Sequence, residues 1–252
     1  MQGKTFKETN MKLLEAMAIS VCAACFAAGG VQAGERCAPP PTSGLIVNVM
    51  DKGARGDGVS NDTKAIQFAV DLVAGSGGTV FVPDGVFMVD AVTGIRLGSD
   101  MTLRLSSGAI IKAIPNAATS YNLIRLDKVS NVSVIGGTLL GERSAHSGSA
   151  GQWGMGINIL GAEHVVVEGV TAKDAWGDGF YVGNLSRNIK FCSIAADNNR
   201  RQGMSVVSVD GLSVLDSSFT NTGGVGPQGG IDIEPNDKDT VNDVRIRHSR
   251  FV

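Results

Sequence analysis

Hydrophobic residues in the second half of the chain recur in short alternating segments at a nearly constant spacing. Four segments that each begin with glycine align with one another, at 156–159, 179–182, 203–206 and 230–233. Their glycines are 23, 24 and 27 residues apart. Alternation with a period of two is typical of a strand with one buried face, and a repeat in the low twenties is typical of a solenoid.

A second series of alternating segments lies between the members of the first. Its members are 132–134, 165–167, 189–191, 212–214 and 244–246. None of the repeats has a helical pattern or a leucine-rich asparagine ladder, which favours a β-helix over a leucine-rich repeat. We therefore predict an all-β, parallel β-helix solenoid whose coils stack at the strand spacing of about 4.8 Å. Branched apolar residues would fill the bore, and glycine or asparagine would occupy the corners.

The pattern between residues 46 and 85 is different, because it predicts one short amphipathic helix between two strands. A strand at 46–49 is followed by a glycine-punctuated turn at 51–58. Asn61-Asp62 stands where a helix N-cap is expected, and apolar residues at 65–73 share one helical face. Gly77-Gly78 would end this helix before the next strand. The glycines precede the acidic cap and do not form a GxGxxG pattern, which excludes a nucleotide-binding unit.

This stretch resembles the N-terminal module of the pectate lyase superfamily, which polygalacturonase-like, rhamnogalacturonase-like and epimerase-like proteins share with some phage tailspikes. The matching residues are Asn48-Val49, Asp51, Gly53-Ala54, Gly56-Asp57-Gly58, Asn61-Asp62-Thr63, Ala65-Ile66-Gln67, Gly77-Gly78-Thr79-Val80-Phe81-Val82-Pro83 and Gly85. The resemblance implies a right-handed parallel β-helix solenoid with a short N-terminal capping α-helix. It also implies that Asp51, Asp57 and Asp62 are turn and cap residues rather than catalytic ones.

The first 33 residues are expected to lie outside the fold. An apolar stretch from Leu13 to Ala28 is followed by Val31-Gln32-Ala33, small residues of the kind that a signal peptidase reads. The alternative is that this segment is an amphipathic N-terminal helix that is not cleaved. The charged residue Glu15 within the apolar stretch supports that alternative. We predict a signal peptide at 1–33, a leader at 34–44, and one β-helix domain at 45–252 whose last coil has no cap. The protein would then be secreted or periplasmic, with no membrane segment in its mature form.

Composition and charge exclude several classes of protein. Glycine supplies 34 of 252 residues without a Gly-X-Y period, which excludes collagen, and the 43% hydrophobic content excludes wholesale disorder. A net charge of −2 gives no electrostatic footprint for nucleic acid. Beyond residue 33 only Cys37 and Cys192 remain, and two distant cysteines make no disulfide framework. Cys192 is interpreted as a small packing residue of a strand.

The alternation also divides the side chains of the aligned segments between the bore and the outer face. One outward column is Asn158, Tyr181, Ser205 and Asp232, and the next is Leu160, Gly183, Val207 and Glu234. Extra residues are inserted just before this sheet at 141–154 and 221–229. Longer loops on one side of a solenoid usually wall a binding groove, so we predict a groove over these columns.

Asp232 and Glu234 are the candidate acid and base of this groove, with Asp178 in support. The two carboxylates lie on one face of one strand, about 7 Å apart from the strand rise. Such a separation suits inverting hydrolysis of a glycoside. An arginine or tyrosine near a carboxylate or Ca²⁺ would suit β-elimination from a uronic acid instead, in which a cation neutralises the sugar carboxylate and a base removes the C5 proton.

Five further residues are predicted to bind the substrate, with Arg201 on a substrate carboxylate. They are Arg201, Arg200, Tyr181, Trp176 and Asn158. Each candidate also has a structural interpretation: Asp232 and Glu234 suit a solvated strand face, Asp178 suits the turn Gly177-Asp178-Gly179, and Trp176 suits loop packing. His146, His164 and His248 share no metal spacing and are expected at the surface.

No catalytic motif of a named family can be transferred onto this chain. The Asn-Thr-Asp-Gly, Gly-Asp-Asp, Gly-His-Gly and Arg-Ile-Lys segments of polygalacturonases are absent. Alginate epimerases show Tyr-Gly-Phe-Asp-Pro-His where this chain has Gly179-Phe180-Tyr181-Val182-Gly183, which keeps the Gly-Phe but loses the acid and the histidine. The resemblance therefore implies the fold and leaves the reaction open.

The sequence leaves two functions in competition. The first is a secreted lyase or glycoside hydrolase that acts on an acidic, uronate-containing polysaccharide, with no cofactor or with Ca²⁺. The second is a non-catalytic β-helix, such as an adhesin, a tailspike-like stalk or a carbohydrate-binding protein. In both cases the expected partner is a polysaccharide, and an open last coil could also pair with another chain to form an oligomer.

Overall fold

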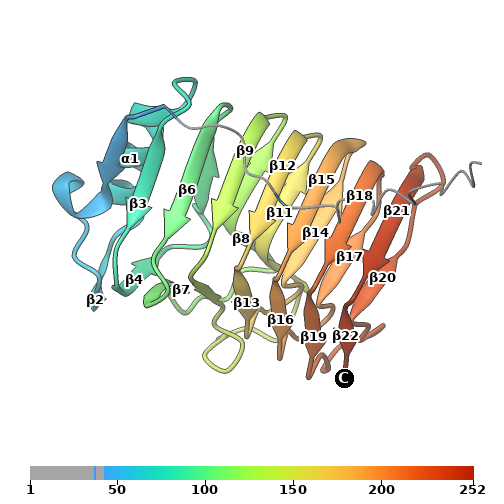
Figure 1. Ribbon diagram of the computed structural model, residues 1–252. Coiled ribbons are helices and arrows are strands. Elements are labelled where there is room, and N and C mark those ends of the chain that lie inside the picture. The colour runs from blue at the N-terminus through green and yellow to red at the C-terminus, as the bar shows by residue number, and fades with distance from the viewer. Residues whose placement is uncertain (1–36, 38–42) are drawn as a thin grey trace, which may run out of the picture. The chain divides into compact units, whose positions relative to one another are not determined.

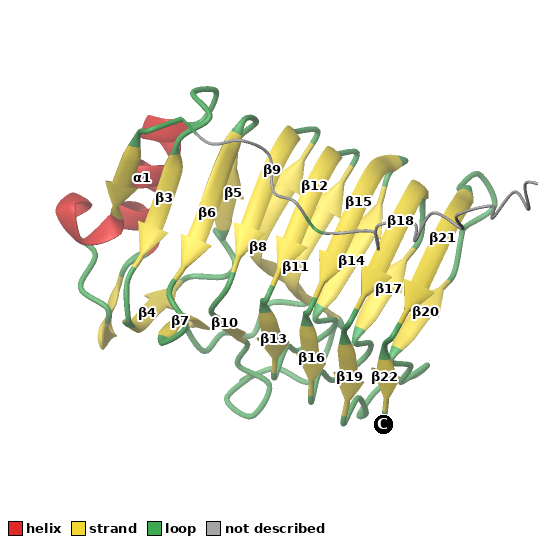
Figure 2. Cartoon of the chain, in the orientation of Figure 1, coloured by secondary structure: helices red, strands yellow, loops and turns green. Residues whose placement is uncertain are grey.

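Parallel β-strands stack coil upon coil along one axis in the computed structural model, which describes Cys37 and residues 43–252 (Figure 1). Each complete coil supplies one strand to each of three sheets, and every strand pairs only with its counterparts in the coils before and after it. The result is the all-β, right-handed parallel β-helix that the sequence pattern and the resemblance imply. Its only α-helix lies at the N-terminal end of the described residues (Figure 2).

The first sheet contains eight parallel strands. They are β1 (Ile46–Asn48), β3 (Thr79–Val82), β6 (Met101–Leu105), β9 (Ser130–Ile135), β12 (Glu163–Glu168), β15 (Ser186–Cys192), β18 (Val209–Leu215) and β21 (Val241–Arg247). In this sheet Val165 pairs with Ile189, and Ile189 pairs with Leu212. The second predicted series of segments is thereby confirmed.

The second and third sheets complete the coils. The second sheet is β2 (Asp57–Asn61), β4 (Gly85–Val89), β7 (Ala109–Ala113), β10 (Thr138–Leu140), β13 (Thr171–Lys173), β16 (Ala195–Asp197), β19 (Ser218–Thr220) and β22 (Arg250–Phe251). The third sheet is β5 (Ile95–Leu97), β8 (Ser120–Asp127), β11 (Trp153–Leu160), β14 (Phe180–Gly183), β17 (Met204–Val206) and β20 (Ile231–Ile233). Asn158 pairs with Tyr181, Tyr181 with Ser205, and Ser205 with Asp232, which confirms the first outward column.

The bore is filled by the inward residues of all three sheets. Ile157, Ile159 and Val182 are fully buried, as the alternation predicts. Aromatic rings contribute more than the sequence pattern suggests. Phe180 and Phe191 meet edge to face with their centroids 5.4 Å apart, an arrangement that aromatic rings favour.

Helix α1 (Thr63–Val73) packs its apolar face, including Ile66 and Val70, against the first coils and the 3₁₀ turn η1 (Val49–Lys52). Asn61 Oδ1 accepts the Thr63 backbone N–H at 3.1 Å, whereas Asp62 accepts the amides of Arg55 and Gly56 in the preceding turn. Asp62 is therefore a turn residue rather than a side-chain cap of the helix. The helix ends at Val73, earlier than Gly77-Gly78 predicted.

A left-handed backbone conformation recurs near the start of five strands of the first sheet and stacks in a column. Register places Asn131, His164, Asn188, Gly211 and Asp243 above one another, with φ between 49° and 85°. Side chains other than glycine pay a steric penalty of roughly 1–2 kcal/mol in this region, and asparagine and aspartate tolerate it best. This column contains His164 as well as asparagine, aspartate and glycine. Glycine and asparagine also have positive φ directly after strands, at Gly136, Gly169, Asn198 and Asn221, as predicted for the corners.

Cys37 and Cys192 form a disulfide, which corrects the interpretation of Cys192 as a simple packing residue. The bond joins residues separated by 155 positions and holds Cys37 to the end of strand β15. Sequence spacing gave no sign of this pair because the two cysteines meet only once the coils have stacked. Disulfides persist mainly in oxidising compartments, which is where an exported protein folds.

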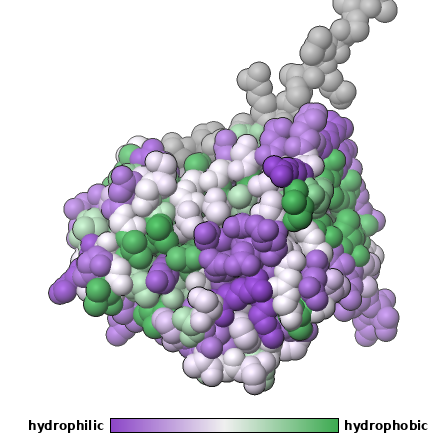
Figure 3. Space-filling model, turned by 90° about the horizontal axis from the view of Figure 1, so that it is seen from below, coloured by the Kyte–Doolittle hydropathy of each residue, from purple (hydrophilic) through white to green (hydrophobic). Residues whose placement is uncertain are grey.

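The last coil exposes apolar side chains. Ile233, Ile246 and Phe251 are between 38% and 50% exposed, and hydrophobic residues gather at this end of the molecule (Figure 3, right). The predicted oligomer through this coil stays a prediction. The predicted signal peptide at 1–33 lies outside the described residues, as does most of the leader. In the described part of the chain, no helix has the length and apolar character needed to cross a membrane.

The column of left-handed residues in the first sheet generates a first prediction. His164 is exposed and has φ 54°, so His164→Gly removes a steric penalty while His164→Val increases it. We expect the valine variant to unfold with a free energy about 1–2 kcal/mol lower than the glycine variant, measured by urea denaturation. Equal stabilities of the two variants would show that the left-handed conformation at position 164 carries no such penalty.

The disulfide generates a second prediction. Reduction by a thiol reagent should lower the melting temperature, because the bond restricts the unfolded chain; loop closure between distant residues stabilises by at most about 5 kcal/mol. The variant with both Cys37→Ser and Cys192→Ser should melt at the lower temperature with or without reductant. A variant that still responds to reductant would contradict the assignment of this pair.

Candidate functional site

The outer face of the third sheet contains a groove of about 460 Å³. Asn158, Tyr181, Arg201 and Glu234 line it, together with Trp153 at the start of β11. Trp153 is 49% exposed, and Gln152, at the end of the long insertion, lies beside it. The predicted groove over the outward columns is therefore present, and one of its two predicted walls contributes to its lining.

Hydrogen bonds to Asp178 and Ser205 hold the Arg201 guanidinium in place. Its Nη1 donates to Asp178 Oδ2 and to Ser205 Oγ, both at 3.0 Å. Ser205 Oγ in turn donates to Asp178 Oδ2 at 2.8 Å. Asp178 precedes β14 and Arg201 precedes β17, so stacking of adjacent coils brings the carboxylate under the guanidinium. The Asp178 side chain is fully buried and Arg201 is 12% exposed. Asp178 therefore positions Arg201, and only Arg201 faces the groove.

Burial raises the pKa of the Asp178 carboxyl from 3.8 to about 6. The charge of Arg201 and the hydrogen bonds from Ser205, Arg201 and the Gln202 backbone act in the opposite direction and lower it. Desolvation is larger than these effects because the carboxylate has lost all contact with water. The residue therefore gains and loses its charge within the range of pH in which many enzymes work.

The two predicted acid–base residues differ in their surroundings. Glu234 Oε2 lies 3.7 Å from Arg201 Nη2, and the Glu234 side chain is 63% exposed. Asp232 Oδ2 accepts a hydrogen bond from Gln202 Nε2 at 2.6 Å, and Gln202 Oε1 accepts the Gly229 amide. The Glu234 carboxylate is thus accessible to a ligand in the groove, whereas the Asp232 carboxylate is oriented by the buried side-chain amide of Gln202.

Tyr181 and Asn158 extend the groove toward β8. Asn158 Nδ2 donates to Asn122 Oδ1 at 2.8 Å, and Asn158 Oδ1 is buried without a partner among the described residues. Burial raises the pKa of Tyr181, and the charge of Asp178 raises it further. Tyr181 is therefore a protonated phenol that can donate a hydrogen bond to a ligand.

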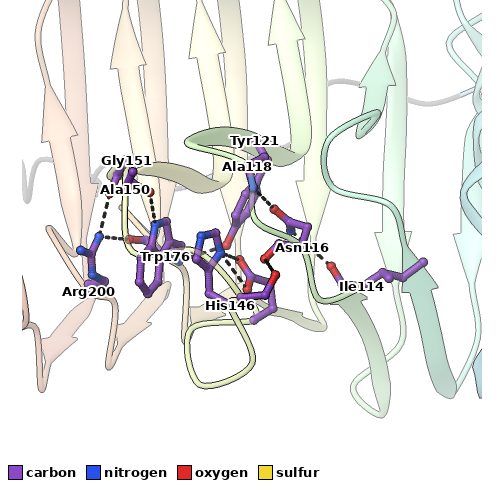
Figure 4. A network of polar contacts seen from close by, with 11 residues as sticks. Ile114, Asn116, Ala118, Tyr121, His146, Ala150, Gly151, Trp176 and Arg200 are labelled. Atoms are coloured by element: carbon purple, nitrogen blue, oxygen red, sulfur yellow. Dashed lines mark hydrogen bonds and ion pairs between the residues drawn. The ribbon is translucent and has the colours of Figure 1, made fainter.

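Arg200 and Trp176 lie in a separate cluster beside the groove (Figure 4). The Arg200 guanidinium carbon lies 3.7 Å from the Trp176 ring centroid, and the His146 ring stacks on the same indole at 3.9 Å. Arg200 Nη1 also donates to the Gly151 carbonyl at 3.0 Å. These contacts hold the long insertion against the coils. The structure does not bring these two predicted substrate-binding residues into the groove.

His146 is fully buried, so its predicted surface position is wrong. Its Nδ1 lies 2.9 Å from Glu142 Oε1, and Glu142 is also buried. His164 and His248 are exposed, as predicted. The insertion therefore has a small polar core of its own. The sequence pattern did not predict it, because the partners of His146 are Trp176 on another coil and Glu142 earlier in the same loop.

Ser205 and Gln202 also belong to the site, although the sequence pattern did not predict them there. Ser205 stood in the predicted outward column, but its contact with Asp178 crosses from one coil to the next. Gln202 stands directly before the repeat glycine Gly203, as Asp178 stands directly before Gly179. This equivalent position in the repeat could have indicated that Gln202 belongs to the site. Among residues 43–252 and Cys37, no group of three acidic, histidine or cysteine side chains is arranged to hold a metal ion.

The buried carboxyl generates a third prediction. A carboxyl whose pKa is raised in the folded state contributes stability below its unfolded pKa and loses that contribution as the pH rises through its folded pKa. The free energy of unfolding of the wild type, relative to Asp178→Asn, should therefore fall between pH 3.8 and about 6. Urea denaturation at several pH values measures this difference, with Asp210→Asn on β18 as the control for losing a surface carboxylate. A difference that grows with pH would overturn the assignment.

The chain is similar in sequence to several known proteins. The chain is 29% identical over 246 residues to the uncharacterized protein YclG of Bacillus subtilis, covering 82% of this chain and 42% of that protein. It is 31% identical over 193 residues to the mannuronan C5-epimerase AlgE5 of Azotobacter vinelandii, covering 69% of this chain and 19% of that enzyme. The chain thus spans less than half the length of these relatives.

The solved structure of the family 28 exopolygalacturonase of Yersinia enterocolitica superposes with a TM-score of 0.64 at 18% identity. The match covers 83% of this chain and 49% of that enzyme, and at this identity it supports the fold alone. Residues 46–250 match the family described as rhamnogalacturonase A/epimerase, pectate lyase-like, which is almost the whole described β-helix. The chain belongs to this family.

Proposed function

We propose that this protein binds an acidic, uronate-containing polysaccharide along its third sheet and cleaves or remodels it as a lyase or glycoside hydrolase. The observation that carries the proposal is the arrangement of Arg201, which is held by buried Asp178 and lies between that residue and exposed Glu234. A fixed guanidinium with an acid–base group beside it suits a sugar that bears a carboxylate.

In this proposal Arg201 pairs with the carboxylate of a uronate residue. The guanidinium is preorganised by its bonds to Asp178 and Ser205, so little reorientation is needed when the ligand binds. Neutralising the sugar carboxylate also makes the adjacent C5 proton easier to remove. Ca²⁺ remains the alternative source of this positive charge.

Glu234 and Asp232 are proposed as the acid and base. In hydrolysis one would protonate the leaving oxygen of the glycosidic bond while the other takes a proton from the attacking water. In β-elimination one would take the C5 proton, and the C4–O bond to the leaving sugar would break as the C4–C5 double bond forms. Tyr181, a protonated phenol in the same groove, could then supply a proton to the leaving oxygen.

We also propose that the protein is exported, with residues 1–33 as its signal peptide and 34–44 as a leader. The Cys37–Cys192 disulfide supports an oxidising compartment. The relative AlgE5 supports the choice of polymer, since it is named as a mannuronan C5-epimerase.

A fourth prediction tests the acid–base pair. Glu234→Gln and Asp232→Asn should each lower turnover by at least about a hundredfold, because each removes a proton donor or acceptor, while polymer binding and folding persist. Purified protein is incubated with polygalacturonate, polymannuronate and other uronans, with EDTA or with added Ca²⁺. Ultraviolet absorbance of unsaturated ends reports β-elimination, reducing ends report hydrolysis, and deuterium uptake at C5 reports epimerisation.

The outcomes distinguish the competing functions. Binding without any of the three products by the wild type would favour the non-catalytic β-helix. Neither binding nor turnover across the acidic polymers would contradict the proposal as a whole. Arg187 is exposed on strand β15 of the first sheet and does not line the groove. Arg187→Gln should therefore retain wild-type activity and serves as the control for loss of a surface charge.

A further inference from the structure

We infer that Arg96 and Arg125 form a second anion-binding site on the third sheet, which holds an acidic group of the same polysaccharide some distance from Arg201. This inference rests on the proposed function for the identity of the polymer. Arg96, Leu97, Arg125 and Asp127 line a depression of about 260 Å³, separate from the groove that contains Arg201.

Strand register places the two arginines in line with the groove. Arg96 pairs with Arg125, Arg125 pairs with Asn158, and the same row continues through Tyr181 to Ser205. Because each strand is displaced by about 4.8 Å, Arg125 and Arg96 stand about 14 Å and 19 Å along the row from Ser205, the contact of Arg201. The groove reaches the same strand as Arg125, since Ser120 and Asn122 of β8 line it. A polymer along this row would cover both sites.

The charges around the two arginines are unbalanced. Arg125 Nη2 donates to Asp127 Oδ2 at 2.7 Å, and these side chains are 37% and 41% exposed. Arg96 is exposed, and its backbone forms hydrogen bonds with the Gln67 side chain. Among the described residues, no carboxylate forms an ion pair with the Arg96 guanidinium. Like charges directly opposite each other on adjacent strands are destabilising. One carboxylate for two guanidinium groups leaves a positive charge that a ligand can neutralise.

The chemistry favours a planar oxyanion. An arginine offers several N–H donors in one plane and binds carboxylate or sulfate in a bidentate manner. Asp127 already occupies one side of Arg125, so the ligand would be shared between Arg96 and the remaining donors of Arg125. Carboxylates on successive sugars of a uronate polymer present such groups at regular intervals, and a neutral polysaccharide presents none.

The test compares Arg96→Gln, Arg125→Gln and the double variant with the wild type in binding to uronates of two lengths. An oligomer of about six sugars is long enough to cover the row, whereas a disaccharide reaches only the Arg201 end. The double variant should bind the long oligomer at least about fivefold more weakly, the combined effect of two exposed ion pairs, and the loss should shrink as salt is added. Disaccharide affinity should not change, and Arg187→Gln should match the wild type for both ligands.

Three outcomes would overturn the inference in distinguishable ways. Equal affinity of the wild type and the double variant for the long oligomer would reject the second site and leave the proposed function intact. An equal loss for the disaccharide would show that the arginines act on the Arg201 site rather than as a separate one. If only binding of inorganic sulfate changes, the pair takes free anions and not the polymer. A wild type that binds no uronate would remove the proposed function and this inference together.

Discussion

The constraint on which the structure depends is the parallel, in-register stacking of coils, with a left-handed residue recurring at the same place in successive coils. Each strand finds its hydrogen-bond partners only in the coils on either side, so a shift by one residue would turn every side chain of that coil from bore to surface. His164 and Asp243 share the column of Asn131, Asn188 and Gly211, which shows that the backbone conformation, rather than a particular side chain, is what repeats.

Stacking also builds the candidate site, because it brings charged residues that are 23 and 33 positions apart in sequence into ion pairs. Asp178, Arg201 and Glu234 belong to three successive coils, yet each contacts the next. Loss of water around the Asp178 carboxylate raises its pKa. The ion pair with this carboxylate holds the Arg201 guanidinium at the groove. Asp178 and Ser205 contact the Nη1 atom of Arg201, so that the Nη2 atom, on the side of the groove, can donate to a ligand.

The fold could be predicted from the sequence because it depends on a repeated pattern, whereas the site depends on contacts between repeats. Alternation and glycine spacing predicted the rows that contain Tyr181 and Asp232, and the resemblance predicted the capping helix. The same pattern could not show that Asp178 lies beneath Arg201, or that Trp176 and Arg200 pack with His146 in the insertion. Those contacts depend on how far a side chain reaches across the 4.8 Å or so between coils. The Cys37–Cys192 bond was missed for the same reason, since its partners meet only in the assembled stack.

The outward residues of the third sheet form rows that cross its strands, and this arrangement favours one kind of ligand over another. The row from Arg96 to Asp232 crosses six strands at right angles to the chain direction, so equivalent positions recur at one strand spacing. A polymer with a short, regular repeat can match such a row at several points, while a small molecule meets only one or two of its residues. Weak contacts that act together on one chain raise its affinity beyond that of each contact alone. The architecture that stabilises the chain therefore also favours a linear, charged polymer over a compact ligand, and a different set of outward residues on the same rows would suit a different polymer.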